Sequence, residues 1–199
     1  MDSRSVPLPA LEIHPVTTRR WMELERLFGE RGAYAGCWCM WWRMTRSEFN
    51  GKGAHERKDA MKGIVDSGEV PGVIAYVDGE PMAWCSVAPR ENYGALERSR
   101  KLKRIDDEPV WSVVCFFFAK PFRGRGLMVP LLKAAVEYAK QHGAKVVEGY
   151  PVQPKEGEVV SGGTVGFMGI ASAFRKAGFV EVAQRGDSVK QLIMRYTIR

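Results

Sequence analysis

One segment, residues 110–143, constrains the fold of this chain more than any other. Residues 110–118 are nearly all apolar, β-branched or aromatic, as is typical of a strand buried on both faces. A basic turn, Arg123-Gly124-Arg125-Gly126, comes next. Apolar residues then recur at helical spacing, with charged residues on the opposite side, until a stop at Gly143. This order predicts a buried strand, a tight turn and an amphipathic helix.

The turn in this segment has the properties of a phosphate-binding loop. The first amides of a helix have no partner within it, and the helix dipole places partial positive charge there. Glycines let an anion approach the backbone closely, and arginines add bidentate contacts. Pro130 falls near the first helical turn, where a missing N–H costs least. We therefore predict a pyrophosphate site; the alternative is an ordinary strand-to-helix turn.

Length and composition indicate a globular protein. A chain of 199 residues suits a single domain, residues 1–199, although two small domains remain open. Hydrophobic content of 45% and charged content of 27% are ordinary. No stretch is apolar enough to cross a bilayer, and the N-terminus lacks the apolar core of a signal peptide. We expect a cytoplasmic protein with no membrane partner.

The four cysteines do not indicate a disulfide scaffold or a metal site. Cys37 and Cys39 are separated by one residue, whereas structural zinc sites usually have two or more residues between cysteines. The three histidines are scattered. We expect no metal, and interpret the thiols as small buried groups or as part of a pocket wall.

The net charge of +7 and pI near 9.3 are compatible with a polyanionic partner. The densest basic run, residues 98–104, is followed at once by acidic residues 106–108, as at a solvated helix end. No nucleic-acid motif is present, so we expect no nucleic-acid partner, and a nucleic-acid-binding protein ranks lowest among the readings. A phosphorylated small ligand explains the arginines more economically.

The remaining pattern completes a mixed α/β sheet. Antiparallel N-terminal strands, a parallel central βαβ unit and an antiparallel finish are predicted, with helices on both faces. The expected strands are residues 11–16, 70–77, 82–87, 145–152, 180–184 and 189–198, with a turn at Asp78-Gly79. The expected helices are residues 17–28, 46–64 with a break near 51–53, 92–104 and 169–176, and residues 153–166 are expected to be a loop.

Two motifs resemble the GNAT superfamily of N-acetyltransferases. In FRGRGLM, residues 122–128, Arg123 and Gly126 match fixed positions of the family's acyl-CoA signature, and Met128 stands where Gly or Ala is usual. FRKAGFVEV, residues 174–182, resembles the family's later helix-turn-strand. Phe174 occupies a position where many members have a catalytic tyrosine.

The resemblance implies a single-domain GNAT-like fold whose parallel central strands splay apart, and acetyl-CoA as cosubstrate. The pyrophosphate would lie on the amides after the strand, and the pantetheine arm would pair with the strand like an added strand. The residues so assigned to the cofactor are Phe116, Phe117, Phe118, Arg123, Gly124, Arg125, Gly126, Leu127, Met128 and Ser172. A small-molecule or peptide amine would enter from the other side, and a homodimer is left open.

Direct acetyl transfer from the thioester to the amine needs a proton donor or acceptor near the reacting atoms. Phe174 cannot supply a proton, so another group does this, or the thiolate leaves without specific help, or the protein does not catalyse the reaction. The catalytic candidates are Glu148 and Tyr150, which lie on one face of a strand. In the alternative, Glu148 pairs with a nearby arginine and Tyr150 packs at the strand end. Cys115 faces the thioester or is an inert buried thiol.

The segment CWCMWWR, residues 37–43, should border the acceptor pocket. Trp38, Trp41 and Trp42 offer flat apolar surface and Arg43 offers an anion anchor; in the alternative, at least two of the tryptophans fill the core. A protein of this fold that binds CoA without catalysis, as an inactive or regulatory module, is the second functional hypothesis.

Overall fold

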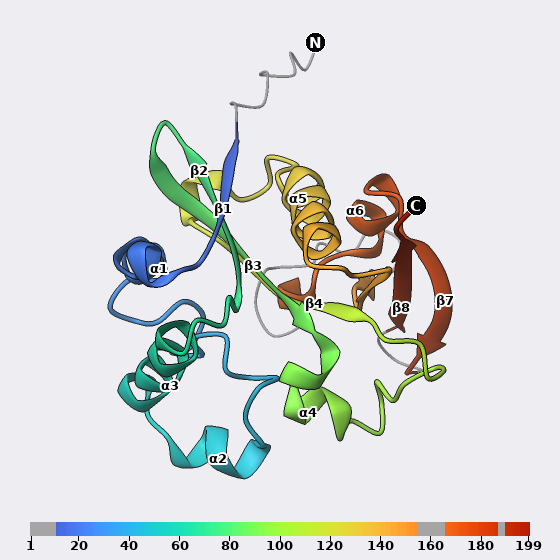
Figure 1. Cartoon of the computed structure of the whole chain (residues 1–199), viewed down its shortest axis with the longest axis horizontal. Coiled ribbons are helices and arrows are strands. Elements are labelled where there is room, and N and C mark those ends of the chain that lie inside the picture. The colour runs from blue at the N-terminus through green and yellow to red at the C-terminus, as the bar shows by residue number, and fades with distance from the viewer. Residues whose placement is uncertain (1–10, 155–165, 187–189) are drawn as a thin grey trace.

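A twisted eight-stranded sheet runs through the molecule (Figure 1). The computed structural model describes residues 11–154, 166–186 and 190–199. The strand order is β1-β2-β3-β4-β5-β8-β6, with β7 also paired to β8. The strands are β1 (Glu12–Pro15), β2 (Gly72–Val77), β3 (Glu80–Pro89), β4 (Trp111–Phe118), β5 (Val146–Gly149), β6 (Val152–Gln153), β7 (Val180–Arg185) and β8 (Lys190–Thr197).

The helices lie at the positions that periodicity predicts, with one exception treated below. The α-helices are α1 (Trp21–Phe28), α2 (Arg46–Gly51), α3 (Ala54–Asp66), α4 (Gly94–Glu97), α5 (Met128–Gln141) and α6 (Ala171–Lys176). Short 3₁₀ turns are η1 (Thr18–Arg20), η2 (Arg90–Asn92), η3 (Lys120–Phe122) and η4 (Gly166–Met168). Among the described residues, no helix is long and apolar enough to cross a membrane.

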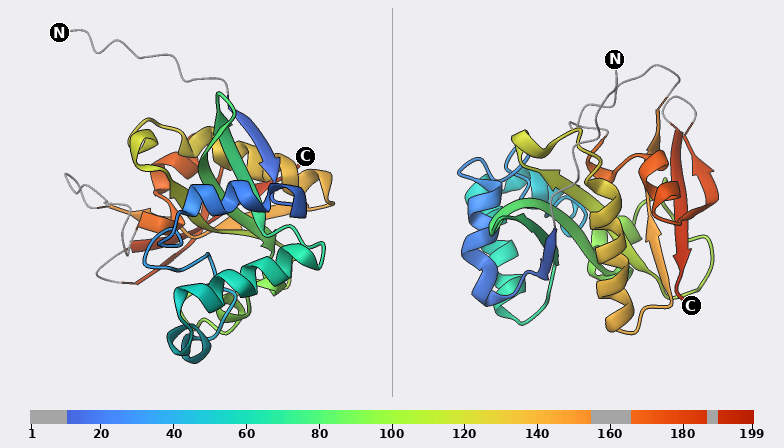
Figure 2. Two further views of the ribbon diagram at one scale, coloured as in Figure 1. Left: turned by 90° about the vertical axis from the view of Figure 1, so that its left-hand side faces the viewer. Right: turned by 90° about the horizontal axis from the view of Figure 1, so that it is seen from above.

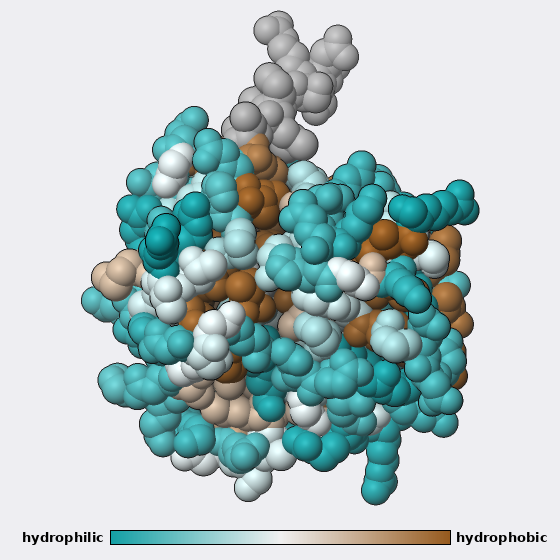
Figure 3. Space-filling view, in the orientation of Figure 1, coloured by the Kyte–Doolittle hydropathy of each residue, from teal (hydrophilic) through white to brown (hydrophobic). Residues whose placement is uncertain are grey.

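Helices cover both faces of the sheet, as predicted. Successive side chains of a strand point to opposite faces. Ile74 and Tyr76 of β2 therefore pack in one buried cluster with α1 and α3, and Val73, Ala75 and Val77 pack in another with α5 and α6. The right-hand view of Figure 2 shows α1 on one side of the strands and α5 on the other. The face seen in Figure 3 is largely hydrophilic, with apolar groups in small separate areas.

The parallel centre of the sheet is short and then splays, as predicted. β4 and β5 are parallel over three pairs, from Trp111 with Val147 to Val113 with Gly149. Beyond Val113, β4 continues to Phe118 alongside β3 only. A register shift in the pairing of β3 with β4 leaves Val114 as an extra residue, a bulge that bends a strand. The last residues of β4 therefore present a strand edge that β5 does not cover.

The predicted helix at residues 92–104 is wrong. Only α4, four residues long, is helical there. The buried guanidinium of Arg90 donates from Nη2 to the carbonyl oxygens of Leu96 and Leu102, at 3.5 and 2.7 Å. Carbonyls that a regular helix would use internally thus accept from a distant side chain, and the chain wraps around that arginine.

The predicted strand at residues 145–152 is divided into β5 and β6. Pro151 lies between them and has no N–H for a ladder. Its carbonyl accepts from the Leu192 amide at 2.9 Å, and the Val152 amide donates to Gly169 at 3.0 Å. Most of the predicted loop, residues 155–165, lies outside the described residues.

Candidate active site

A cavity of about 850 Å³ lies beside the uncovered end of β4. Its wall joins parts of the chain that are distant in sequence: loop residues from Ala33 to Trp42 with Phe49, the β4 residues Cys115 to Phe118, the segment from Phe122 to Val129, and residues of η4 and α6 between Gly166 and Lys176. The predicted phosphate turn, the strand before it and the loop of residues 33–42, the aromatic loop, therefore line the same cavity.

The glycine turn leaves its amides available. Gly124 and Gly126 have φ values of 73° and 74°, and a Cβ at either would meet no atom within 4 Å. Glycine is thus required by backbone conformation rather than by space. Within the described chain, the amides of residues 124–129 have no main-chain acceptor, and the first helical bond runs from Leu131 N to Leu127 O at 3.2 Å. Pro130 is the third residue of α5, within its first turn.

Cationic side chains stand around these amides. Among the described residues that line the cavity, the charged ones are Arg123, Arg125 and Lys176. Arg123 donates from Nε to the Phe118 carbonyl at 2.9 Å, so the end of β4 holds this guanidinium beside the turn. Positive charge and free N–H groups at a helix start are the elements of an anion site.

The three phenylalanines at the end of β4 all line the cavity. Phe116 and Phe118 stack at 6.4 Å between ring centroids, whereas Phe117 points to the opposite face and contacts Phe28 at 5.5 Å. The main chain of β4 lies between these two sets of rings. An extended ligand arm fits an uncovered strand edge flanked in this way.

The four residues predicted for the acceptor separate into two pairs. Trp41 and Trp42 line the cavity. Trp38 is 3% exposed and stacks with Trp21 at 6.0 Å, so it fills the core, whereas Trp41 and Trp42 are only partly buried and the alternative expected at least two in the core. The Arg43 side chain is 5% exposed and donates to Glu69 at 2.7 Å, outside the cavity lining.

This separation follows from an irregular backbone. Ala33, Ala35, Trp38 and Cys39 have φ values of 65°, 52°, 43° and 53°. Each left-handed residue other than glycine costs roughly 1–2 kcal/mol and persists only where packing fixes it, often at functional sites. The tryptophans therefore do not follow a helical turn.

The model of the acetyltransferase (GNAT) family matches residues 36–154, more than half of the chain. The chain belongs to the GNAT acetyltransferase family. No curated protein matches it in sequence. The matched range includes the aromatic loop, β4, the glycine turn and α5, which are the parts that build most of the cavity.

Solved GNAT-type structures share the fold at low sequence identity. An acetyltransferase of the GNAT family from Streptococcus agalactiae is 12% identical, with a TM-score of 0.53 and coverage of 95% of this chain and 96% of that one. A ribosomal-protein-alanine N-acetyltransferase from Brucella melitensis is 15% identical, with a TM-score of 0.51 and coverage of 94% and 99%. An agmatine N-acetyltransferase variant in its apo form is 11% identical, with a TM-score of 0.56 and coverage of 94% and 99%. These similarities concern the fold alone.

Phe174, which the motif resemblance aligns with the tyrosine of many GNAT members, belongs to the core. It is fully buried and lies outside the cavity lining. Its ring packs against Phe116 and Phe179 at centroid distances of 6.1 and 4.9 Å. Ser172, two residues earlier, is exposed and lines the cavity with Met128.

Glu148 and Tyr150 lie together in a buried network rather than in the cavity lining. Arg90 Nη1 donates to Glu148 Oε1 at 3.0 Å and to the Tyr150 hydroxyl at 2.7 Å. Tyr150 donates to Glu148 Oε1 at 2.7 Å, and Arg195 donates to Glu148 Oε2 at 2.8 Å. Burial, followed by the adjacent carboxylate, raises the pKa of Tyr150 well above its ordinary value. Ser112 of β4, 2.8 Å from that hydroxyl, links the network to the central sheet.

Three of the four thiols lie on the cavity wall. Cys37 and Cys39 come from the aromatic loop and Cys115 from β4. The Sγ atoms of Cys39 and Cys115 are 3.3 Å apart. The interpretation of the thiols as part of a pocket wall is confirmed for these three, whereas Cys85 is buried and not part of the lining.

Proposed function

We propose that this GNAT protein transfers an acetyl group from acetyl-CoA directly to an amine. The observation that carries the proposal is the set of amides at residues 124–129, which have no main-chain acceptor among the described residues and face the same cavity as the uncovered edge of β4. A diphosphate suits these donors, and the thioester would supply the acetyl group. We assign the whole chain, residues 1–199, to one such domain.

In this proposal the chain's own residues bind and orient the reactants. Arg123, Arg125 and the turn amides would hold the pyrophosphate, and the main chain of Phe116 to Phe118 would pair with the pantetheine arm. Ser172 stands where it can contact that arm. Orientation of this kind accounts for roughly 7–11 kcal/mol of a barrier in well-aligned reactions.

The acceptor would lie against Trp41 and Trp42, which form flat walls of the cavity. The indole N–H of Trp42 is buried and has no acceptor within the described residues. An acceptor with an aromatic or apolar part and an oxygen near its amine would use both features. Agmatine and a ribosomal-protein alanine are named for two of the similar structures; neither name assigns the acceptor here.

A second function, CoA binding without catalysis, is favoured by one observation. Phe174 is buried and has no hydroxyl, so the usual GNAT acid is missing. Neither Glu148 nor Tyr150 lines the cavity. If they take part in catalysis, they must do so indirectly, through Ser112 and β4.

Two measurements on the full chain test the proposal. Calorimetric titration with acetyl-CoA measures cofactor binding, and thiol release across a panel of small and peptide amines measures transfer. Binding together with amine-dependent thiol release is expected. Binding without release across the panel would favour the second function, and absence of binding would overturn both.

A further inference from the structure

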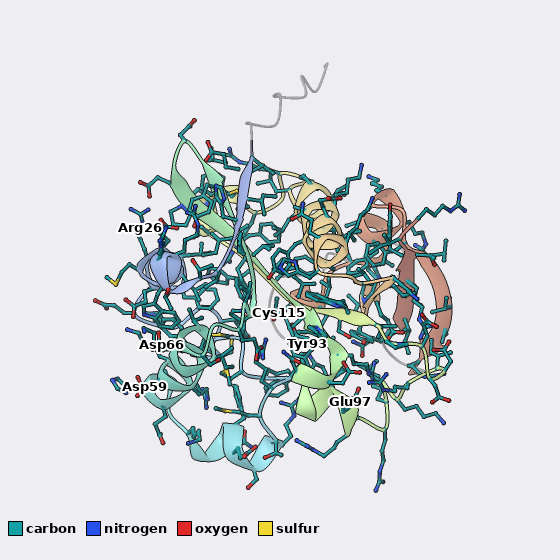
Figure 4. The ribbon with its side chains drawn as sticks, in the orientation of Figure 1. Arg26, Asp59, Asp66, Tyr93, Glu97 and Cys115 are labelled. Atoms are coloured by element: carbon teal, nitrogen blue, oxygen red, sulfur yellow. The ribbon has the colours of Figure 1, made fainter. Side chains whose placement is uncertain are left out.

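The cavity wall that includes the glycine turn also holds a cluster of three thiols. Cys37 is half-buried, whereas Cys39 and Cys115 are 3% and 8% exposed. Figure 4 shows Cys115 near the middle of the molecule, on the central sheet. Cys37 is the most exposed of the three and therefore the most accessible to a molecule in the cavity. Cys39 contacts both of the other thiols, Cys37 and Cys115.

The surroundings of Cys37 stabilise its thiolate. The Cys39 thiol, together with main-chain amides of the same loop, lowers the pKa of Cys37 to about 7 against the opposing effect of burial. Burial, with hydrogen bonds to Cys115 and Cys37, raises the pKa of Cys39 well above its ordinary value. An accessible thiolate beside a second thiol is the usual setting of cysteines that react with disulfides.

We propose that Cys37 is a thiol–disulfide exchange site for the disulfide form of coenzyme A, and that the resulting mixed disulfide blocks the cavity reversibly. The choice of coenzyme A disulfide as the ligand rests on the proposed function. The amides and cations at one end of the cavity suit the phosphates, and the end of β4 would lead the sulfur towards Cys115 and its neighbours. A disulfide of glutathione lacks the phosphates that the turn would hold.

The exchange is balanced without a further oxidant. The Cys37 thiolate attacks one sulfur of the disulfide, a bond forms between these two sulfurs, and the original S–S bond breaks. The second CoA leaves with the electron pair as a thiolate and takes a proton from water. Cys37 is oxidised and one CoA is reduced. Since the raised pKa of Cys39 makes it a poor nucleophile, the mixed disulfide is expected to persist until an external thiol reduces it.

The test uses the full chain, CoA disulfide and, as a matched probe, glutathione disulfide. Intact-mass spectrometry follows the gain of one CoA less two hydrogens, and fragmentation of the tryptic peptide 32–43 distinguishes Cys37 from Cys39. We expect one adduct, on Cys37, formed at least about ten-fold faster with CoA disulfide, because a bound disulfide reacts as though within one molecule. Dithiothreitol should remove it, and excess acetyl-CoA should slow its formation.

Variants and peptide mapping distinguish failure of this inference from failure of the proposed function. Cys37→Ser should form no adduct, while Cys85→Ala, which changes a buried thiol outside the cavity, should react like the parent. An adduct mapped to Cys39 or Cys115 in the parent protein would overturn the proposal even if Cys37→Ser fails to fold. No adduct despite calorimetric binding of acetyl-CoA would overturn the inference and leave the proposed function standing. Equal rates with both disulfides, without protection by acetyl-CoA, would overturn the choice of ligand and also count against CoA binding.

Discussion

The ring of Phe174 occupies the space directly over Gly149, where an added Cβ would lie 2.2 Å from the ring's Cε1. Gly169 closes the other side, since a Cβ there would lie 2.7 Å from Cε2. The two glycines thus create the slot in which Phe174 packs, just after the point where β4 and β5 separate. The ring therefore packs beside the point where the two strands part, outside the lining of the cavity.

Restoring the usual GNAT tyrosine at this position should not restore an acid. In Phe174→Tyr the new hydroxyl would be buried in an apolar slot, so we expect the free energy of unfolding to fall by about 1–3 kcal/mol and thiol release to stay unchanged or decrease. Phe122→Tyr, the same change at a partly exposed ring, controls for stability. A rise in turnover without loss of stability would show that the hydroxyl reaches the reacting atoms.

Arg125 should contribute to cofactor affinity. Removal of one charge-assisted contact to a phosphate weakens binding by about 10- to 100-fold, so Arg125→Ala should raise the calorimetric Kd for acetyl-CoA by that amount. Lys133→Ala, at an exposed position of α5, the helix that follows the turn, is the matched control and should bind normally. Equal losses in both variants would indicate a general charge effect instead of a contact.

Two variants distinguish a structural role of the buried Glu148 network from a catalytic one. Glu148→Gln leaves Arg195 and Arg90 with a weakened buried partner, and we expect a loss of stability approaching 3–5 kcal/mol, roughly the cost of breaking such a pair. Tyr150→Phe should cost less because the ion pairs remain. Chemical denaturation measures both. The turnover number of the folded variants decides the catalytic role: a large loss supports it, and parental turnover assigns the pair to structure.

The unpartnered N–H of Trp42 should act on the acceptor. For the best amine found in the panel, Trp42→Phe removes one hydrogen bond while keeping a flat ring, so KM for the amine should rise about five-fold with little change in kcat. Stability should not decrease, because a buried donor without an acceptor in the described chain is removed. A lower kcat at constant KM would contradict this assignment.

The reactivity of Cys37 should depend on pH in a defined direction. Because its pKa is lowered to about 7, the reactive thiolate should be half-formed near pH 7, and alkylation by iodoacetamide should slow at lower pH. The titratable or charged side chains on the same wall are Cys39, Cys115 and Tyr34 nearby, with Arg123, Arg125 and Lys176 at the phosphate end. In Cys39→Ala the midpoint should move upward, because the principal hydrogen bond to the thiolate is lost. An unshifted midpoint would exclude that cause.

Local patterns predict the secondary structure around the glycine turn well. The strand at residues 110–118, the turn and the helix at 128–141 each depend on neighbours in sequence, so periodicity and glycine positions were sufficient. The splay is implied only by resemblance to the family, and the packing beside it, of Phe174 against Gly149 and Gly169, joins segments that are distant in sequence.

Long-range contacts explain what local patterns missed. The helix expected at residues 92–104 does not form because the Arg90 side chain donates hydrogen bonds to main-chain carbonyls of that segment. The same side chain also binds Glu148, 58 positions away in sequence. The contact of Cys39 with Cys115 spans 76 positions. The only local signal for this thiol cluster is the pair of cysteines beside tryptophans in residues 37–42. Such a pattern does not show whether the side chains line a cavity or fill the hydrophobic core.

The loop from Gly32 to Cys39, with several residues of positive φ, is anchored beneath the aromatic wall by close packing. A Cβ on Gly32 would lie 2.1 Å from Trp38 Nε1, so the buried tryptophan and the glycine fix the curvature of the loop together. Under the proposed function, exchange of the rings at positions 41 and 42 would change the acceptor preference without disturbing this anchor. Lengthening or shortening the loop would instead dislodge its anchor, so relatives of this protein should diversify in ring chemistry before they diversify in loop length.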